Sequence, residues 1–230
     1  MKKVLIVRGG WEGHQPIETT DSFIPFLKGE GFDVRLEGST AIYADHEYMS
    51  TVDLIIQAIT FGTLEDSEVE GLLASVSNGA GFVGWHGGVL ASFGLSEKYL
   101  HMIGAIFVSH PGKIASERTG DQSDWFVPHS YTVTPSGKRH EITAGIEDFE
   151  LTTEQYWLLH DPYMDILATT TQAKRAEDPW HEPVTSPAIW TRLWGEGKIF
   201  VITAGHDLEI LNNDNVRKII ERGITWASKR

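Results

Sequence analysis

Three absences narrow what this chain can be. None of its 230 residues is cysteine, which excludes disulfide bonds, thiolate metal ligands and a cysteine nucleophile. Basic residues are few, 19 against 32 acidic ones, and the charge of −13 disfavours nucleic acid as a partner because phosphate backbones are also negative. No apolar run approaches the roughly 18 residues of a membrane span, and Val4–Val7 is too short for a secretory signal of roughly 7–15 apolar residues. We therefore expect a cytoplasmic protein with no membrane partner.

The residues that are present indicate one folded domain. The chain is 41% hydrophobic and 22% charged, a composition typical of globular proteins. A chain of this length buries roughly 70% of its unfolded surface, which suffices for one sizeable core. Because no repeat, low-complexity segment or linker interrupts it, residues 1–230 are predicted to form a single domain.

Short apolar segments alternate with helical patterns along most of the sequence. Strands that are apolar on both faces favour a mainly parallel, open sheet with helices on both faces. The segment 112–190 differs, with β-rich pieces and loops rich in Pro, His and Trp, and is predicted to be a β-rich insertion in the same domain. The predicted strands are 4–7, 32–36, 53–59, 81–85 and 199–202, with antiparallel strands at 125–133, 165–171 and 188–190.

The helices are predicted from apolar spacing and from end signals. A first helix over 17–30 contains Pro25, which should kink or shorten it. A second has apolar residues every three or four positions from Val69 to Val76, with Thr63 predicted to cap its start and Gly79 its end. A third lies at the C-terminus. Gly9 and Gly10 are predicted to form a loop after the first strand.

Four histidines follow predicted strands, namely His14, His86, His110 and His206. In open α/β sheets, ligands bind beyond the carboxyl ends of the strands. Each of the four has glycine or proline beside it, and glycine lets the backbone approach a ligand closely. This pattern predicts a site built from histidines, although exposed loops also collect histidines without any function.

His86 lies between glycines in Gly84-Trp85-His86-Gly87-Gly88. A residue so flanked at a strand-to-helix turn resembles a nucleophile elbow. Imidazole can serve there as a general acid or base or as a metal ligand. The alternative is a glycine-rich turn whose histidine bonds only to backbone.

A metal site would have to be assembled from distant loops, because no local metal motif is present. His14, His86 and His206, with Glu154 beside them, could bind a divalent cation such as zinc or manganese. No nucleotide cofactor is expected, since no Gly-x-Gly-x-x-Gly follows the first strand.

Tryptophan is abundant, with eight residues. Trp11, Trp85 and Trp190 lie beside or near the predicted site, where flat amphipathic rings suit a sugar, although such rings also suit cores and oligomer interfaces. An acidic chain with a Trp- and His-rich cleft fits a neutral polyol. A homo-oligomer is compatible with these features.

Taken in order, several motifs resemble the ThuA-like (trehalose utilisation) family, and the resemblance covers residues 3–228. It implies a fold similar to class I glutamine amidotransferases and flavodoxin. Two departures stand out: the family commonly has His-Pro at His140-Glu141 and Asp-Glu at Thr153-Glu154. The motifs are the first-strand loop ending in His14, Gly79-x-Gly81, the segment Gly84–Gly88, Ser109-His110-Pro111, the segment His140–Gly145, Glu154-Gln155-Tyr156, the segments Pro187–Trp190 and Gly197–Phe200, Gly205-His206 and Gly223-Ile224-x-Trp226-Ala227.

The resemblance implies a sugar or keto-sugar ligand. Because the amidotransferase cysteine corresponds to His86, glutaminase chemistry is excluded. We expect an enzyme of carbohydrate metabolism that acts on a trehalose-like disaccharide or its keto form, with a separate dehydrogenase as partner. The alternative is a non-catalytic sugar-binding or regulatory module. The expected catalytic residues are His86, Glu154 and His206, and the expected substrate contacts are His14, Trp85, Gly87, Gly88, His110 and Trp190.

Overall fold

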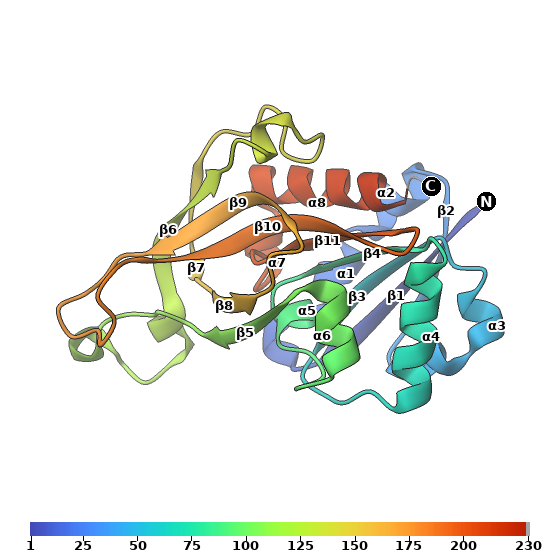
Figure 1. Cartoon of the computed structure of the whole chain (residues 1–230), viewed down its shortest axis with the longest axis horizontal. Helices are drawn as coiled ribbons and strands as arrows, with labels where there is room; N and C mark the ends of the chain where they lie inside the picture. Colours follow the sequence, from blue (N-terminus) through green and yellow to red (C-terminus); the bar gives the residue numbers. More distant parts are fainter. Residues whose placement is uncertain (229–230) are drawn as a thin grey trace.

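The structure is a computed structural model that describes residues 1–228. A nine-stranded mixed sheet runs through the molecule in the order β2-β1-β3-β4-β11-β10-β9-β6-β7, and β5 pairs with β8 in a separate two-stranded sheet (Figure 1). The strands are β1 (Lys2–Gly10), β2 (Phe32–Glu37), β3 (Leu54–Thr60), β4 (Gly81–Trp85), β5 (Ala105–Ser109), β6 (Phe126–Val133), β7 (Phe149–Glu154), β8 (Trp157–His160), β9 (Asp165–Gln172), β10 (Val184–Trp194) and β11 (Gly197–Ile202).

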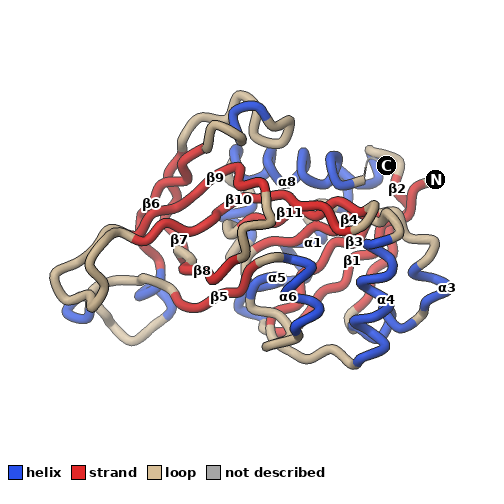
Figure 2. Tube along the Cα trace, viewed as in Figure 1, coloured by secondary structure: helices blue, strands red, loops and turns tan. Residues whose placement is uncertain are grey.

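Helices cover both faces of the parallel part of the sheet (Figure 2). The α-helices are α1 (Pro16–Asp21), α2 (Ile24–Gly29), α3 (His46–Met49), α4 (Asp66–Ser77), α5 (Gly87–Leu90), α6 (Glu97–Ile103), α7 (Leu208–Leu211) and α8 (Asp214–Ala227). The 3-10 helices are Glu12–His14, Thr40–Ala44, Ala115–Glu117, Gln122–Trp125 and Gly137–Arg139.

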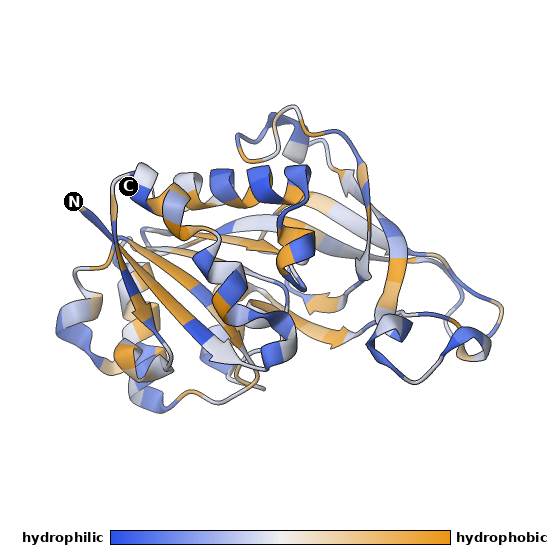
Figure 3. Cartoon of the chain, turned by 180° about the vertical axis from the view of Figure 1, so that it is seen from behind, coloured by the Kyte–Doolittle hydropathy of each residue, from blue (hydrophilic) through white to orange (hydrophobic). Residues whose placement is uncertain are grey.

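Two hydrophobic clusters lie on opposite faces of the sheet. Because side chains alternate along a strand, Val4 and Ile6 of β1 pack with α2 and α8, whereas Leu5 and Val7 pack with α4 and α6. Figure 3 shows the same division, with hydrophobic strands inside and hydrophilic residues on the outer side of α8. Within residues 1–228, no helix is long and apolar enough to cross a membrane.

The parallel half of the sheet consists of β2, β1, β3, β4 and β11. The prediction of a loop at Gly9 and Gly10 is wrong, since β1 continues to Gly10, which pairs with Thr60 of β3. Gly10 has φ +81°, and a Cβ there would lie 2.0 Å from the Thr60 carbonyl oxygen. Only glycine fits this position, because both the space and the backbone conformation exclude a side chain.

Two helix boundaries differ from the sequence predictions. The first crossover is split into α1 and α2, with Pro25 in the first turn of α2, where its missing N–H costs nothing. Thr63 does not cap α4. Glu65 does, in a reciprocal capping box with Glu68, while Gly79 follows the helix with φ +111°.

The β-rich middle of the chain continues the same sheet. β10 pairs antiparallel with β11 on one side and with β9 on the other. β9 pairs in turn with β6, and β6 pairs with β7 at the end of the sheet. β10 is much longer than the predicted segment 188–190, and Trp125 belongs to a 3-10 helix before β6. The molecule therefore has a parallel half and an antiparallel half joined at β10 and β11.

The fit of Gly10 against β3 can be tested by substitution. Gly10→Ala should lower the free energy of unfolding by more than about 2 kcal/mol, since the Cβ meets the Thr60 backbone in addition to the left-handed strain. Gly31→Ala is the matched control, because Gly31 has φ +80° with no atom near its Cβ position, and should cost about 1 kcal/mol. Urea denaturation measures both, and equal losses would contradict the steric account.

Candidate metal centre

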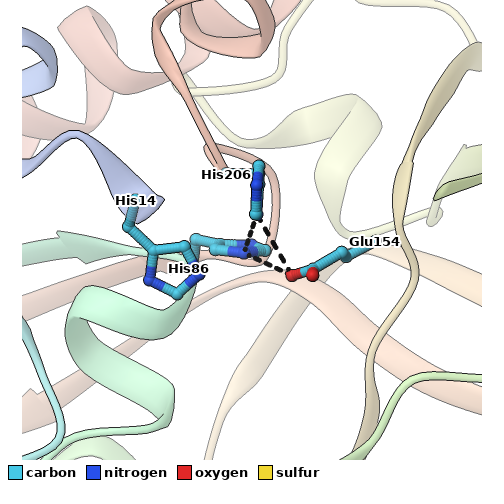
Figure 4. A group of neighbouring side chains, drawn as sticks. All are labelled: His14, His86, Glu154 and His206. Atoms are coloured by element: carbon cyan, nitrogen blue, oxygen red, sulfur yellow. Dashed lines mark hydrogen bonds and ion pairs between the residues drawn. The ribbon is translucent and has the colours of Figure 1, made fainter. Parts of the chain in front are cut away.

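Three of the four histidines expected at one sheet edge meet at the carboxyl ends of the parallel strands. The fourth, His110, follows β5, which lies in the separate two-stranded sheet, so its placement on the same sheet was wrong. His14 ends the 3-10 helix after β1, His86 follows β4, and His206 lies in the loop after β11. Glu154 comes from the other half of the sheet, where it is the last residue of β7. Figure 4 shows these four side chains turned toward one point.

The ligand atoms of this cluster are spaced as around a small cation. Glu154 Oε2 lies 2.9 Å from His86 Nε2 and 3.2 Å from His206 Nδ1, and the two ring nitrogens are 3.3 Å apart. Tetrahedral zinc with bonds of about 2.0–2.1 Å separates its ligand atoms by about 3.3 Å. One atom of His14 joins them, and all four lie within 4.8 Å of one another.

Hydrogen bonds from neighbouring groups fix the orientation of the cluster. His86 Nδ1 lies 2.8 Å from the Thr203 carbonyl and His14 Nδ1 lies 2.7 Å from Thr60 Oγ1. The amide of Gln122 donates to Glu154 Oε1, which leaves Oε2 for the histidines. Such outer contacts set the tautomer and the direction of metal ligands in proteins.

His110 is a further member of the cluster, on its open side. Its Nε2 lies 3.3 Å from Glu154 Oε2, and its Nδ1 lies 3.2 Å from the carbonyl of Gln155. Its side chain is 18% exposed, whereas those of His86 and Glu154 are buried. A small molecule could therefore reach His110 more easily than His86.

Burial and charge act in opposite directions on the pKa values of this cluster. Burial lowers the pKa values of His86 and His110, with Glu154 opposing this effect. Burial also raises the pKa of Glu154, but its contacts with His206 and His86 prevail and hold that pKa well below its usual range. His86 Nδ1 can only donate to the Thr203 carbonyl, so Nε2 carries a lone pair when His86 is neutral and donates a proton to Glu154 when it is protonated. A divalent cation would take the place of that proton, because metal ligands must be deprotonated.

Small residues create the space for these rings. His86 has φ +50°, a strained conformation for a residue with a side chain and a frequent feature of functional sites. A Cβ on Gly87 would lie 2.3 Å from Cε1 of His14, and a Cβ on Gly88 would lie 2.8 Å from Cα of Ala58. Gly87 thus leaves space for the ring of His14, and Gly88 allows α5 to pack closely against β3.

The structure places Trp85 and Trp190 in the core. Trp190 is 0% exposed and its Nε1–H donates to the carbonyl of Ile103, while the ring of Trp85 packs on Phe23. The prediction that they stack on a sugar is wrong for this conformation, because strand periodicity does not reveal which face is covered.

Trp11, the third tryptophan expected near the site, does lie at the cluster, together with Tyr156 and Phe126. Trp11, 38% exposed, contacts His14 edge-on, Tyr156 lies against His86, and Phe126 against His206. The sequence could have predicted Tyr156 at the site, because it lies two residues after Glu154 in the motif Glu154-Gln155-Tyr156. Gln122 was missed, since nothing in the sequence of its loop distinguishes it.

Three imidazoles and a carboxylate at the carboxyl edge of a mixed sheet define an α/β protein with a candidate metal centre. The sequence of residues 3–227 matches the model of the ThuA family, described as trehalose utilisation. The chain therefore belongs to the ThuA family and is a trehalose-utilisation-related protein. A comparison with curated proteins found no match.

Solved structures share the fold at low sequence identity. A ThuA-like protein from Parabacteroides merdae is 17% identical with a TM-score of 0.73, covering 99% of this chain and 90% of that one. Another from Bacteroides uniformis is 15% identical with a TM-score of 0.70, covering 98% and 91%. A cytoplasmic protein from Salmonella typhimurium LT2 is 12% identical with a TM-score of 0.65, covering 99% and 100%. These likenesses show the fold alone.

The buried imidazoles make stability depend on pH. Burial, followed by the nearby His86 and His206, lowers the pKa of His14 from 6.5 to about 2. Below pH 6.5 the unfolded chain therefore binds a proton that the folded chain does not, and stability falls as the pH falls. For the metal-free protein we expect the free energy of unfolding to fall between about pH 7 and 5. The contribution of this one histidine is no more than about 1.4 kcal/mol per pH unit.

His14→Asn, which can keep the contact with Thr60, should flatten this loss when urea denaturation is repeated across the pH range. The same substitution at the exposed His46, outside the cluster, is the control. If the free energy of unfolding of His14→Asn depended on pH as steeply as that of the wild type, the pH dependence could not be assigned to His14.

Proposed function

We propose that this protein is a divalent-metal enzyme of carbohydrate metabolism, acting on a trehalose-like disaccharide or its keto form. One observation carries the proposal: His86 Nε2 and Glu154 Oε2 lie 2.9 Å apart, and a nitrogen of His206 lies beside both. The family adds the class of substrate.

The donor set fits the metal. His86, His206 and Glu154 are buried and form the inner part of the site, and His14 lies on its half-exposed side. Three nitrogens and one carboxylate oxygen suit zinc, and manganese is also compatible with these ligands. Bound there, a divalent cation would act as a Lewis acid toward a carbonyl or hydroxyl oxygen of the sugar.

The structure supports a different general base from the one expected from sequence. His86 is enclosed and is better suited to hold the metal, whereas His110 is accessible and has its Nδ1 held by Gln155. His110 Nε2 would accept a proton from the carbon next to a keto group. Glu154 Oε2, 3.3 Å away, would stabilise the resulting imidazolium.

A keto substrate implies a partner protein. Its carbonyl must come from oxidation of a sugar hydroxyl, so we propose a separate dehydrogenase as supplier.

We further propose an amidotransferase-like scaffold in which His86 takes the position of the nucleophilic cysteine.

Metal analysis tests the centre. Protein made without a polyhistidine tag, loaded with zinc or manganese and desalted, should retain about one ion per chain. His86→Ala and Glu154→Gln should each lower retention at least about tenfold, and Gln122→Ala should weaken affinity by roughly 10–100-fold because it frees Glu154 Oε1. His46→Ala is the control. Equal metal in wild type and His86→Ala would refute a metal centre here.

Kinetics test the role of His110. With a substrate identified by screening trehalose, related disaccharides and their keto forms, His110→Ala should lower kcat by roughly 10²–10⁴-fold while metal content stays unchanged. Loss of metal together with activity would make His110 a ligand and contradict the role of base. Sugar binding without turnover of any of these compounds would favour the non-catalytic module.

A further inference from the structure

A cavity of about 260 Å³ adjoins the candidate metal centre at His110. Its walls include the two tryptophans Trp157 and Trp180, whose rings meet edge to face at 4.8 Å, and Gln172 at the end of β9. His110 belongs both to this wall and to the cluster, because its Nε2 lies 3.3 Å from Glu154 Oε2. A ligand in this cavity would thus lie next to the proposed base.

Two residues of this wall, Gln172 and Trp180, each carry a buried polar atom without a hydrogen-bond partner. Within residues 1–228 only four side-chain polar atoms are in that state, and they include Gln172 Oε1 and Trp180 Nε1. Gln172 is 6% exposed, and a buried polar atom with no hydrogen bond costs free energy. One atom is an acceptor and the other a donor, and a hydroxyl group can both donate and accept. Because neither atom is accessible to solvent as placed, the hydroxyl groups of a ligand would pair with them once the two side chains turn toward the cavity.

The charges of the wall favour a neutral ligand. Arg118 and Arg175 are balanced by Glu177 and Asp178. Both arginines already have partners: Arg118 donates to the Lys113 carbonyl and covers Trp125, and Arg175 donates to the carbonyls of Pro111 and Gly112. The four charged side chains of the wall therefore give it no excess of positive charge to attract a phosphate or carboxylate.

We propose that this cavity is the subsite for the non-reacting sugar ring of a disaccharide whose other ring lies at the metal centre. This proposal rests on the proposed function. The volume supports it, since whole-ligand pockets measure roughly 300–1,000 Å³ and this smaller one suits a single ring. Trp157 and Trp180 supply amphipathic ring surface, and Gln172 and Trp180 bind the hydroxyls.

Isothermal titration calorimetry with trehalose, sucrose and glucose 6-phosphate tests the subsite on the metal-loaded chain. Trp180→Phe keeps the ring and removes the donor, and Gln172→Leu keeps most of the volume and removes the acceptor. Each should weaken disaccharide binding about tenfold, the effect of losing about one hydrogen bond, with metal content unchanged. Trp226→Phe, in α8 and outside this cavity, is the control and should leave affinity unchanged.

The outcomes separate this inference from the metal function. Wild-type affinity retained in both cavity variants, no disaccharide binding by the wild type, or tighter binding of glucose 6-phosphate would each overturn the subsite. Disaccharide binding that weakens in the variants of a chain that retains no metal would uphold the subsite while refuting the metal enzyme.

Discussion

A single carboxylate oxygen, Glu154 Oε2, lies within 3.3 Å of ring nitrogens from His86, His110 and His206. This crowded contact is buried, so the electrostatic cost of an unbalanced charge is high. The surrounding structure maintains it at several points: Thr203 orients His86, Gln122 holds the second carboxylate oxygen, and Gly87 leaves space for His14. The proposed metal, base and substrate positions all depend on the geometry of this one oxygen.

The two halves of the sheet make different contributions to the site. The parallel half supplies His14, His86 and His206 from the loops that follow β1, β4 and β11, whereas the antiparallel half supplies Glu154 from β7. Neither half contains a complete site. The long strand β10, which pairs with both β9 and β11, is what aligns the carboxylate with the histidines.

The sequence predicted the convergence of His14, His86 and His206 because parallel strands end at a common edge, a rule that needs no knowledge of side-chain packing. The rule does not account for His110, which follows β5 of the separate two-stranded sheet. The prediction failed for Trp85 and Trp190, since an apolar strand does not reveal whether a ring faces a ligand or the core. It also failed at Gly9-Gly10, which resembles a turn. The two glycines belong to β1, and Gly10 is needed because the backbone of Thr60 leaves no space for a side chain. Gln122 and the cavity at Trp180 depend on irregular loops, whose conformation has no periodic signal.

The distance along the chain between members of the cluster has a consequence for folding. Glu154 is 68 residues from His86, and His206 is 120 residues from it. Contacts of such separation require large loops to close, and they form slowly compared with local ones. The cluster should therefore assemble late, after the central strands have paired, and a cation would bind a nearly native chain and slow its unfolding more than it speeds its folding.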